Sequence, residues 1–319
     1  MRRIVMLTAL FAALATPAGA QDWPAKPIRI LVGFGPGGGT DIATRIIAEP
    51  LGQVLGQAVV VENKPGAGST IASDLVAKAP KDGYTAVMLS AGHTVSAAMF
   101  KSLPYDSVTD FAPVGLVADS AFVIAARKDF PANDVKGLIA LAKAQPGKLN
   151  FATVGIGSTQ QFAGELFRQM AGIDVQHVAY RGTPAVVKAL LAKEVDYAVE
   201  LVHAVNGQVQ AGELKLIAVG APERWPTIPD VPTVAESGVP GYSVVGWYGL
   251  VFPAGTPSSI VEKTNLALKD VLSRPDIRDR LDKIGARAHY STAQEFGGFL
   301  QREIAQWQSV REKANIPQN

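Results

Sequence analysis

The chain has 319 residues, 48% of them hydrophobic, which is enough to bury a core in each of two lobes of about 100–150 residues. It carries 30 Lys and Arg against 28 Asp and Glu, without a basic stripe interleaved with aromatic residues, and this argues against nucleic acid as a partner. The chain holds no cysteine, so we expect no disulfide framework.

The N-terminus is typical of a secretory signal peptide. Arg2 and Arg3 precede an apolar run over residues 4–15, and the small residues Ala18-Gly19-Ala20 follow it. We therefore predict a signal peptide over residues 1–20, cleaved after Ala20, and a protein exported to the periplasm. The apolar run is shorter than the ~20 residues that a membrane-spanning helix needs, and no later segment is long enough. Loss of Arg2 and Arg3 would balance the acidic and basic residues.

A strand, a glycine-rich turn and a helix follow the signal. The strand is expected over 28–32, the turn over 33–39, and Thr40 or Asp41 is positioned to cap the helix. Glycines let a ligand approach the backbone, and the first amides of a helix favour a carboxylate or phosphate. This pattern predicts an anion site, and a tight turn without a ligand is the alternative. Pro50 predicts a bend or break within that helix.

The strand and turn pattern repeats up to a predicted hinge. A second glycine turn spans 63–69, and the next strand carries Ser90 and His93 at its carboxyl end, where ligands gather in open α/β sheets. A lone histidine is more often structural. Two strands separated by a candidate hinge at 118–120 should end the first lobe. The elements expected here are strands at 58–62, 84–89, 114–117 and 121–126 and a helix at 70–79.

A third glycine turn, at 155–159, repeats the first in the predicted second lobe. Ser158 and Thr159 add hydroxyl donors there, although Ser158 is equally suited to capping the helix that follows. The next strand ends in Tyr180, and Glu200 stands at the end of a later one. The expected elements are helices at 134–144, 160–170, 185–191 and 202–211 and strands at 149–153, 174–179, 195–199 and 215–219.

A Pro-rich run over 222–232 should carry the chain back to the first lobe. A strand is predicted at 242–252, then a helix at 258–272 and a short helix from Ser273. Thr292-Ala293-Gln294-Glu295 matches a capping box at the start of the last helix, which should run to about Lys313.

One motif in the first glycine turn is also typical of an enzyme. Gly33-x-Gly35-x-x-Gly38, with Glu62 at the end of the next strand, matches a dinucleotide fingerprint and keeps an NAD-dependent oxidoreductase as the alternative. The export signal and the further glycine turns argue against it. No Gly-x-Ser-x-Gly motif occurs, and the histidines at 93, 177, 203 and 289 lack metal-ligand spacing. We therefore predict neither an enzyme nor a cofactor or metal. A scaffold without a ligand stays open.

The chain resembles the Bug family, the substrate-binding proteins of tripartite tricarboxylate transporters, over essentially the whole predicted mature sequence. The likeness implies an α/β fold of the two-lobed periplasmic binding protein class (type II-like), with the ligand cleft between the lobes. The first lobe would comprise 21–120 and 226–319, and the second 121–225. The segments that carry the likeness are Gly35-Pro36-Gly37-Gly38-Gly39-Thr40-Asp41, Val61-Glu62-Asn63-Lys64-Pro65-Gly66-Ala67-Gly68, Asp82-Gly83-Tyr84-Thr85, Asp110-Phe111-Ala112-Pro113-Val114, Tyr180-Arg181-Gly182 and Trp247-Tyr248-Gly249-Leu250.

The resemblance also implies a ligand and a site. The ligand would be a small organic carboxylate, namely a di- or tricarboxylate, an aromatic acid or an acidic amino acid, delivered by a monomeric receptor to membrane permease subunits. This chain departs from the family pattern at Gly35, Gln161 and Glu200, so no particular ligand is carried over. The implied ligand-binding residues are Phe34, Gly37, Gly38 and Asp41 on one wall, Gly157, Ser158 and Thr159 on the other, and Tyr180 and Glu200 at the far end.

Overall fold

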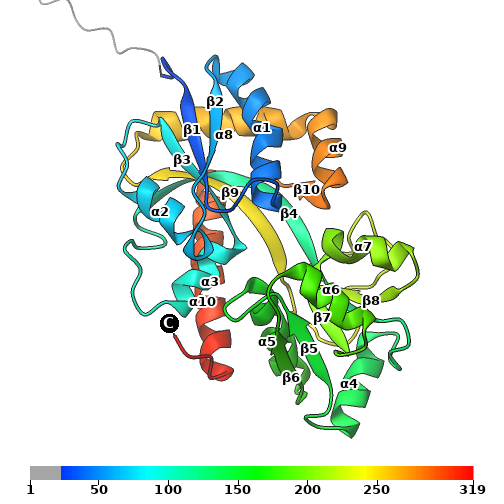
Figure 1. The fold of residues 1–319 in the computed structure, drawn as a ribbon. Coiled ribbons are helices and arrows are strands. Elements are labelled where there is room, and N and C mark those ends of the chain that lie inside the picture. The colour runs from blue at the N-terminus through cyan, green and yellow to red at the C-terminus, as the bar shows by residue number, and fades with distance from the viewer. Residues whose placement is uncertain (1–22, 319) are drawn as a thin grey trace, which may run out of the picture.

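The computed structural model describes residues 23–318, in which ten strands form a sheet that runs through two lobes (Figure 1). The strand order is β2-β1-β3-β9-β4-β7-β5-β6, and β8 and β10 also pair with β4. The strands are β1 (Ile28–Val32), β2 (Val59–Asn63), β3 (Thr85–Ser90), β4 (Phe111–Arg127), β5 (Asn150–Thr153), β6 (Gln176–Ala179), β7 (Tyr197–Leu201), β8 (Leu214–Val219), β9 (Val245–Pro253) and β10 (Ala286–Ala288).

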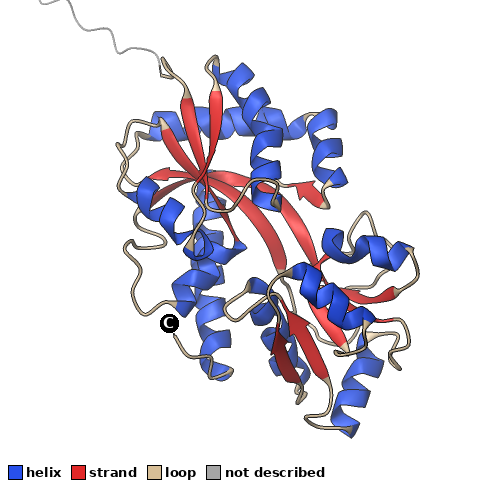
Figure 2. Cartoon of the chain, in the orientation of Figure 1, coloured by secondary structure: helices blue, strands red, loops and turns tan. Residues whose placement is uncertain are grey.

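Helices cover both lobes (Figure 2) and confirm the predicted two-lobed α/β architecture. Within residues 23–318 none of them is long and apolar enough to cross a membrane. A short 3₁₀ turn, η1 (Ala67–Ser69), precedes α2. The α-helices are α1 (Gly39–Leu55), α2 (Thr70–Ala77), α3 (Ala91–Met99), α4 (Val135–Ala144), α5 (Thr159–Ala171), α6 (Thr183–Leu191), α7 (Val202–Gln210), α8 (Ser258–Ser273), α9 (Pro275–Lys283) and α10 (Ala293–Lys313).

Alternation along β1 builds the core of the first lobe. Ile28, Ile30 and Val32 face the helices α1, α8 and α9, whereas Leu31 faces α2 and α10 on the opposite side of the sheet. Successive residues of a strand point to opposite faces, so a five-residue apolar strand fills both layers. The carboxyl end of β1 is thereby held firmly at the start of the first glycine turn.

The strand β4 passes from one lobe into the other. Its residues 111–121 pair with β9, and residues 122–127 pair with β7 and β8. The predicted interruption at 118–120 is wrong, because β9 and β10 both pair with Ala118–Ser120 and satisfy the backbone there. The small β10 strand comes from a segment near the C-terminus, which local sequence patterns could not connect to β4.

The helix α1 also differs from expectation. It continues through Pro50 to Leu55, so the predicted break is wrong. The apolar face that includes Ile47, Leu51 and Leu55 is buried, and this packing outweighs the loss of one backbone hydrogen bond. Its N-cap is Gly38, and neither Thr40 nor Asp41 caps it.

The core of the second lobe includes part of the segment that was expected to have left it. Val234, Val239 and Tyr242 pack in the same cluster as Phe167, and the Tyr242 hydroxyl donates to the Ala163 carbonyl at 3.0 Å. The lobe boundaries stay predictions.

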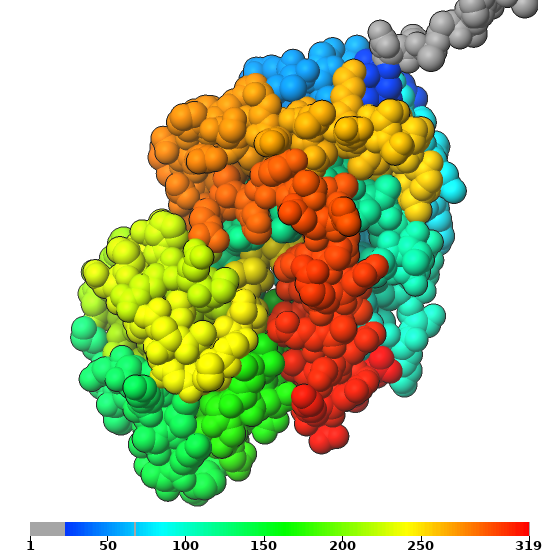
Figure 3. Space-filling view, turned by 180° about the vertical axis from the view of Figure 1, so that it is seen from behind, coloured from blue at the N-terminus to red at the C-terminus, as the bar shows by residue number. Residues whose placement is uncertain are grey.

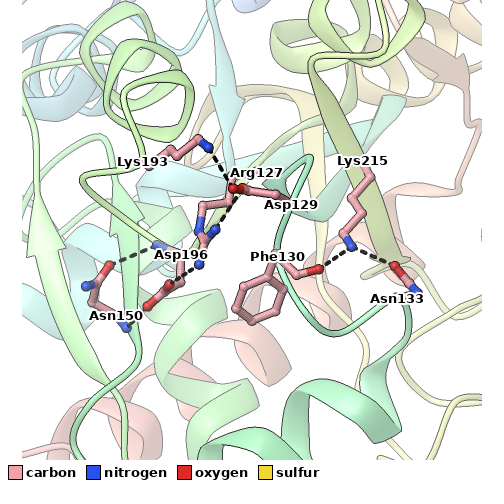
Figure 4. Close-up of polar contacts among 8 residues, drawn as sticks. All are labelled: Arg127, Asp129, Phe130, Asn133, Asn150, Lys193, Asp196 and Lys215. Atoms are coloured by element: carbon pink, nitrogen blue, oxygen red, sulfur yellow. Dashed lines mark hydrogen bonds and ion pairs between the residues drawn. The ribbon is translucent and has the colours of Figure 1, made fainter.

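A polar network closes the far end of the second lobe (Figure 4). Arg127 pairs with Asp129 and Asp196 at 2.7 and 3.4 Å, and Lys193 pairs with Asp129 at 2.7 Å. Asp196 and Asn150 each accept the other's backbone N–H at 3.0 Å. These contacts join the amino ends of β5 and β7, so they hold the register of two strands whose carboxyl ends lie at the opposite edge.

The helix α10 packs on both lobes, as the view from behind shows (Figure 3). Its predicted capping box is confirmed, with Thr292 and Glu295 bonding each other's backbone N–H. Trp307 meets Phe162 of α5 edge-to-face, with ring centroids 5.9 Å apart. Glu303 is buried and accepts hydrogen bonds from Trp247 of β9 at 2.6 Å and Thr94 of α3 at 2.9 Å. One carboxyl group therefore links three elements behind the cleft.

We expect Glu303→Gln to stabilise the protein at alkaline pH. Burial raises the pKa of Glu303 from 4.5 to about 7, although the hydrogen bonds from Trp247 and Thr94 lower it. Between these values the folded state holds a proton that the unfolded state has lost, so wild-type stability falls as pH rises through this window. The gain in melting temperature of Glu303→Gln should therefore be several degrees at about pH 8 and close to zero at about pH 5.

Glu312→Gln is the matched control, because Glu312 is exposed on the same helix. It should follow the wild-type pH profile. A Glu303→Gln profile parallel to that of the wild type would contradict the buried titration.

Candidate functional site

A cavity of about 390 Å³ lies between the two lobes. The first lobe supplies the turn after β1 and the start of α3, and the second lobe supplies the turn after β5 and the start of α7. Ser120 and Phe122 of β4 and Gly246, Trp247 and Tyr248 of β9 complete the wall where the chain crosses between the lobes. The carboxyl ends of β1, β3, β5 and β7 thus all lead into this cavity.

Four helices, α1, α3, α5 and α7, begin at the cavity, and the same positions of each helix line it. The N-cap residue of each helix lines it, and so does the second helical residue. The third helical residue of each helix does not line it. The N-cap residues are Gly38, Ser90, Ser158 and Leu201, and the second helical residues are Thr40, Gly92, Gln160 and His203.

This arrangement gives the cavity a positive potential without charged side chains. The first N–H groups of a helix have no partner within the helix, and the dipole places positive charge beside them. Among residues 23–318, no Lys, Arg, Asp or Glu lines the cavity. An anion placed there receives backbone hydrogen bonds and avoids the desolvation of a buried cation.

Asp41 holds the first glycine turn in place. The Gly37 N–H donates to its carboxylate at 2.9 Å, Arg45 donates at 3.0 Å and Asn63 donates at 2.8 Å. Burial acts to raise the pKa of Asp41, but hydrogen bonds from Arg45, Gly37 and Asn63 hold that pKa below its usual range. Asp41 is only 2% exposed and lies behind the turn, so the structure places neither Asp41 nor Gly37 on the cavity wall.

The second-lobe turn repeats this construction with a neutral side chain. The Gly157 N–H donates to the Gln161 side-chain oxygen at 2.7 Å, across the same spacing of four residues. The Ser158 hydroxyl accepts the Gln161 N–H at 3.2 Å and donates to the Gly155 carbonyl at 2.7 Å. The capping interpretation of Ser158 is confirmed, and its hydroxyl proton already has an acceptor. Gly157, Ser158 and Thr159 all line the cavity.

Aromatic side chains make the rest of the wall apolar. Phe34, Phe122, Trp247 and Tyr248 line the cavity. A Cβ atom on Gly39 would lie 2.5 Å from the Tyr248 hydroxyl oxygen, so this glycine allows β9 to approach the first turn. The cavity wall therefore combines backbone donors with apolar rings, as small-molecule sites commonly do.

Ser90 and His93 have different surroundings. Ser90 is the N-cap of α3 and lines the cavity, whereas His93 is buried behind it. The His93 Nε2 atom lies 2.9 Å from the Ser107 carbonyl oxygen, and its ring stacks on Tyr105. Burial lowers the pKa of His93 to about 4, so the ring is neutral near pH 7. These contacts match the structural alternative.

Tyr180 and Glu200 do not line the cavity. Tyr180 packs beside the second-lobe turn, where its N–H donates to the Thr153 carbonyl at 2.8 Å. Glu200 is fully buried, and burial raises its pKa. Its carboxylate accepts the Leu201 N–H at 3.2 Å and contacts the Gln160 amide at 3.5 Å, so it backs two lining residues.

Several lining residues lay outside the sequence-based set, namely Gln160, His203, Ser120, Phe122, Trp247 and Tyr248. His203 could have been found, because it follows the end of a strand just as Ser90 does. Residues of β4 and β9 could not, because their role depends on the crossing between lobes. No group of three or more potential metal ligands occurs within the part of the chain that the structure describes.

The chain is similar to receptors of one known transporter family. The model of the tripartite tricarboxylate transporter family receptor matches residues 43–316. BugT from Bordetella pertussis is 32% identical over 315 residues, which cover 97% of each chain. These matches confirm the resemblance inferred from the glycine turns.

Solved structures agree with the fold. R. palustris Rpa4515 with adipate has a TM-score of 0.79 and 32% identity, covering 93% of this chain and 100% of that one. MatC from Rhodopseudomonas palustris with bound malate has a TM-score of 0.74 and 34% identity, covering 90% and 99%. The predicted two-lobed binding-protein fold is thereby confirmed.

We expect Ser158→Ala to loosen the start of α5. Loss of the capping oxygen leaves the Gln161 N–H without an acceptor and should cost about 1 kcal/mol of local stability. Amide hydrogen exchange over residues 159–162 should become several times faster, while exchange at the start of α1 stays as in the wild type. Ser158→Asn retains a capping oxygen and should stay near wild-type exchange. Unchanged exchange in Ser158→Ala would show that the cap does not stabilise this turn.

Proposed function

Because the chain belongs to the tripartite tricarboxylate transporter receptor family, we propose that it is a periplasmic receptor that captures a small organic carboxylate and delivers it to membrane permease subunits. The observation that carries this proposal is the convergence of four helix N-termini on an uncharged cavity. The proposed role is binding and transport, without a chemical reaction. The proposed location follows from the secretory pattern of residues 1–20, which lie outside the described residues, and from the family.

Related structures support a carboxylate as the ligand. Adipate and malate, which are found in two of them, are both dicarboxylates of a few carbon atoms. A carboxylate fits the backbone donors at the start of each helix, and the aromatic side chains of the cavity wall fit a carbon chain or ring. The walls come from different lobes, so a ligand with polar groups at both ends would contact both.

Lobe closure is the proposed mechanism. Near the cavity, β4 changes its pairing partners after Ala121. Beside it, the Gly220 N–H donates to the Phe122 carbonyl at 2.7 Å and the Val244 N–H donates to the Gly220 carbonyl at 2.8 Å. Bending at these segments would bring the two sets of helix N-termini together, and an anion that contacts both sets favours the closed state.

We expect Gly38→Val to weaken carboxylate binding by at least about tenfold, because the added side chain blocks approach to the backbone donors of α1. A Cβ atom at Gly38 would meet only the Gly35 carbonyl oxygen, at the ordinary contact distance of 3.6 Å, so the variant should fold. The measurement is a thermal-shift screen of wild type and variant with malate, adipate, citrate, glutamate, benzoate and NAD. A ligand at 100 times its Kd adds about 2.7 kcal/mol.

Gly35→Val is the matched control, because a Cβ atom there has no neighbour within 4 Å and Gly35 does not line the cavity. It should bind as the wild type does. Stabilisation of the wild type by NAD alone would replace the receptor proposal with the oxidoreductase alternative, and normal carboxylate binding by Gly38→Val would refute the site.

A further inference from the structure

His203 lies in the first turn of α7 and forms part of the cavity wall. Its side chain is exposed to the cavity, and neither ring nitrogen has a hydrogen-bond partner among the described residues. An imidazole that faces a ligand cavity with both nitrogens unused is available for the ligand.

His203 packs against the backbone of a glycine far away in the sequence. Gly285, between α9 and β10, has a positive φ of 72° and lies against His203. A Cβ atom on Gly285 would come within 2.7 Å of the His203 Cβ and within 3.3 Å of the ring. This close approach leaves no room for a side chain at residue 285, so His203 lies directly against the Gly285 backbone.

Charged groups on the neighbouring elements have partners of their own. Asp119 on β4 pairs with His289 and Arg287, and Glu200 on β7 bonds the Leu201 N–H. Burial is the cause of the lowered pKa of His203, without a contribution from a charged neighbour. The remaining titratable groups on elements that pack against α7 or flank Gly285 are Arg127 on β4, Tyr197 on β7, Lys215 on β8, and Asp276, Arg278, Asp279, Arg280, Asp282 and Lys283 on α9.

Tyr248 is the other titratable residue that lines the cavity within residues 23–318, and burial raises its pKa to about 12. It therefore stays neutral over the physiological range. His203 is the lining group that can change its charge near neutral pH.

We propose that His203 binds the second carboxylate of a dicarboxylate ligand as the imidazolium, so that each ligand bound brings one proton from solvent into the cavity. This inference rests on the proposed function and names the residue that distinguishes a dicarboxylate from a monocarboxylate. The first carboxylate would occupy the N-termini of α1 and α3, and the second would lie at the N-terminus of α7 beside the ring.

The sign of the pH effect follows from this charge pairing. A carboxylate beside the ring favours the protonated form, so the pKa of His203 must be higher with a dicarboxylate bound than without it. Affinity then rises as pH falls from the bound-state pKa toward the free-state pKa. The second carboxyl group of a dicarboxylate ionises at a higher pH than the first, so a small fraction of it is protonated near pH 6. This protonation weakens binding at the lower pH and therefore acts against the proposed effect, not with it.

The test uses the receptor secreted from its full precursor, with isothermal titration calorimetry at about pH 6 and about pH 8. Malate, succinate and adipate serve as dicarboxylate probes, and butyrate and hexanoate are their monocarboxylate counterparts. Wild type should bind a dicarboxylate more tightly at the lower pH, by up to about tenfold per pH unit. Titrations in two buffers of different ionisation enthalpy should show uptake of about one proton per dicarboxylate.

His203→Gln should weaken dicarboxylate binding at about pH 6 by about tenfold and remove its pH dependence, while monocarboxylate binding stays unchanged. His289→Gln is the control, because His289 pairs with Asp119 outside the cavity, and it should keep the wild-type pH dependence. Dicarboxylate binding without proton uptake, or a pH dependence that survives in His203→Gln, would overturn this inference and leave the receptor function intact. Absence of binding by every carboxylate would overturn both.

Discussion

Unpaired N–H groups at the start of four helices are the feature on which the arrangement of this protein depends. A helix must satisfy these donors with side chains, water or a ligand, because their burial without a partner is costly. In both lobes, parallel strands deliver the helix starts to the same edge of the sheet, and the two edges face each other. The cavity is therefore a consequence of topology, and its preference for anions needs no charged side chain.

Two side chains fix the conformation of the glycine turns beside those donors. Asp41 and Gln161 each take the N–H of the glycine four residues earlier, so the amides that follow stay directed toward the cavity. Asp41 is further held by Arg45 and Asn63, which ties the first turn to β2. The same hydrogen bond to a glycine N–H thus has a charged acceptor, Asp41, in the first turn and a neutral acceptor, Gln161, in the second. The neutral acceptor places less negative charge near the ligand.

Sequence patterns located the glycine turns, the capping box at Thr292 and most elements, because these depend on residues close together in the chain. They could not reveal that β4 is continuous, because β9 and β10 pair with it from distant parts of the chain, or that Tyr242 packs on α5. The sequence predicted which turns form the candidate site, but not which residues of the following helices face the cavity. Asp41 and His93 are third residues of their helices and face away from the cavity, whereas His203 is a second residue and faces it.

The second residues of these helices also differ between the two lobes, and this difference bears on ligand selectivity. In the first lobe the second helical residues are Thr40 and Gly92, which are short, so a ligand there meets mainly the backbone. In the second lobe they are Gln160 and His203, which bring an amide and an imidazole to the cavity wall. Backbone donors accept any carboxylate, but an amide and an imidazole respond to what the rest of the ligand carries. Substitution at these two positions would change the ligand without disturbing a strand or a glycine turn, so ligand identity can change while the fold is retained.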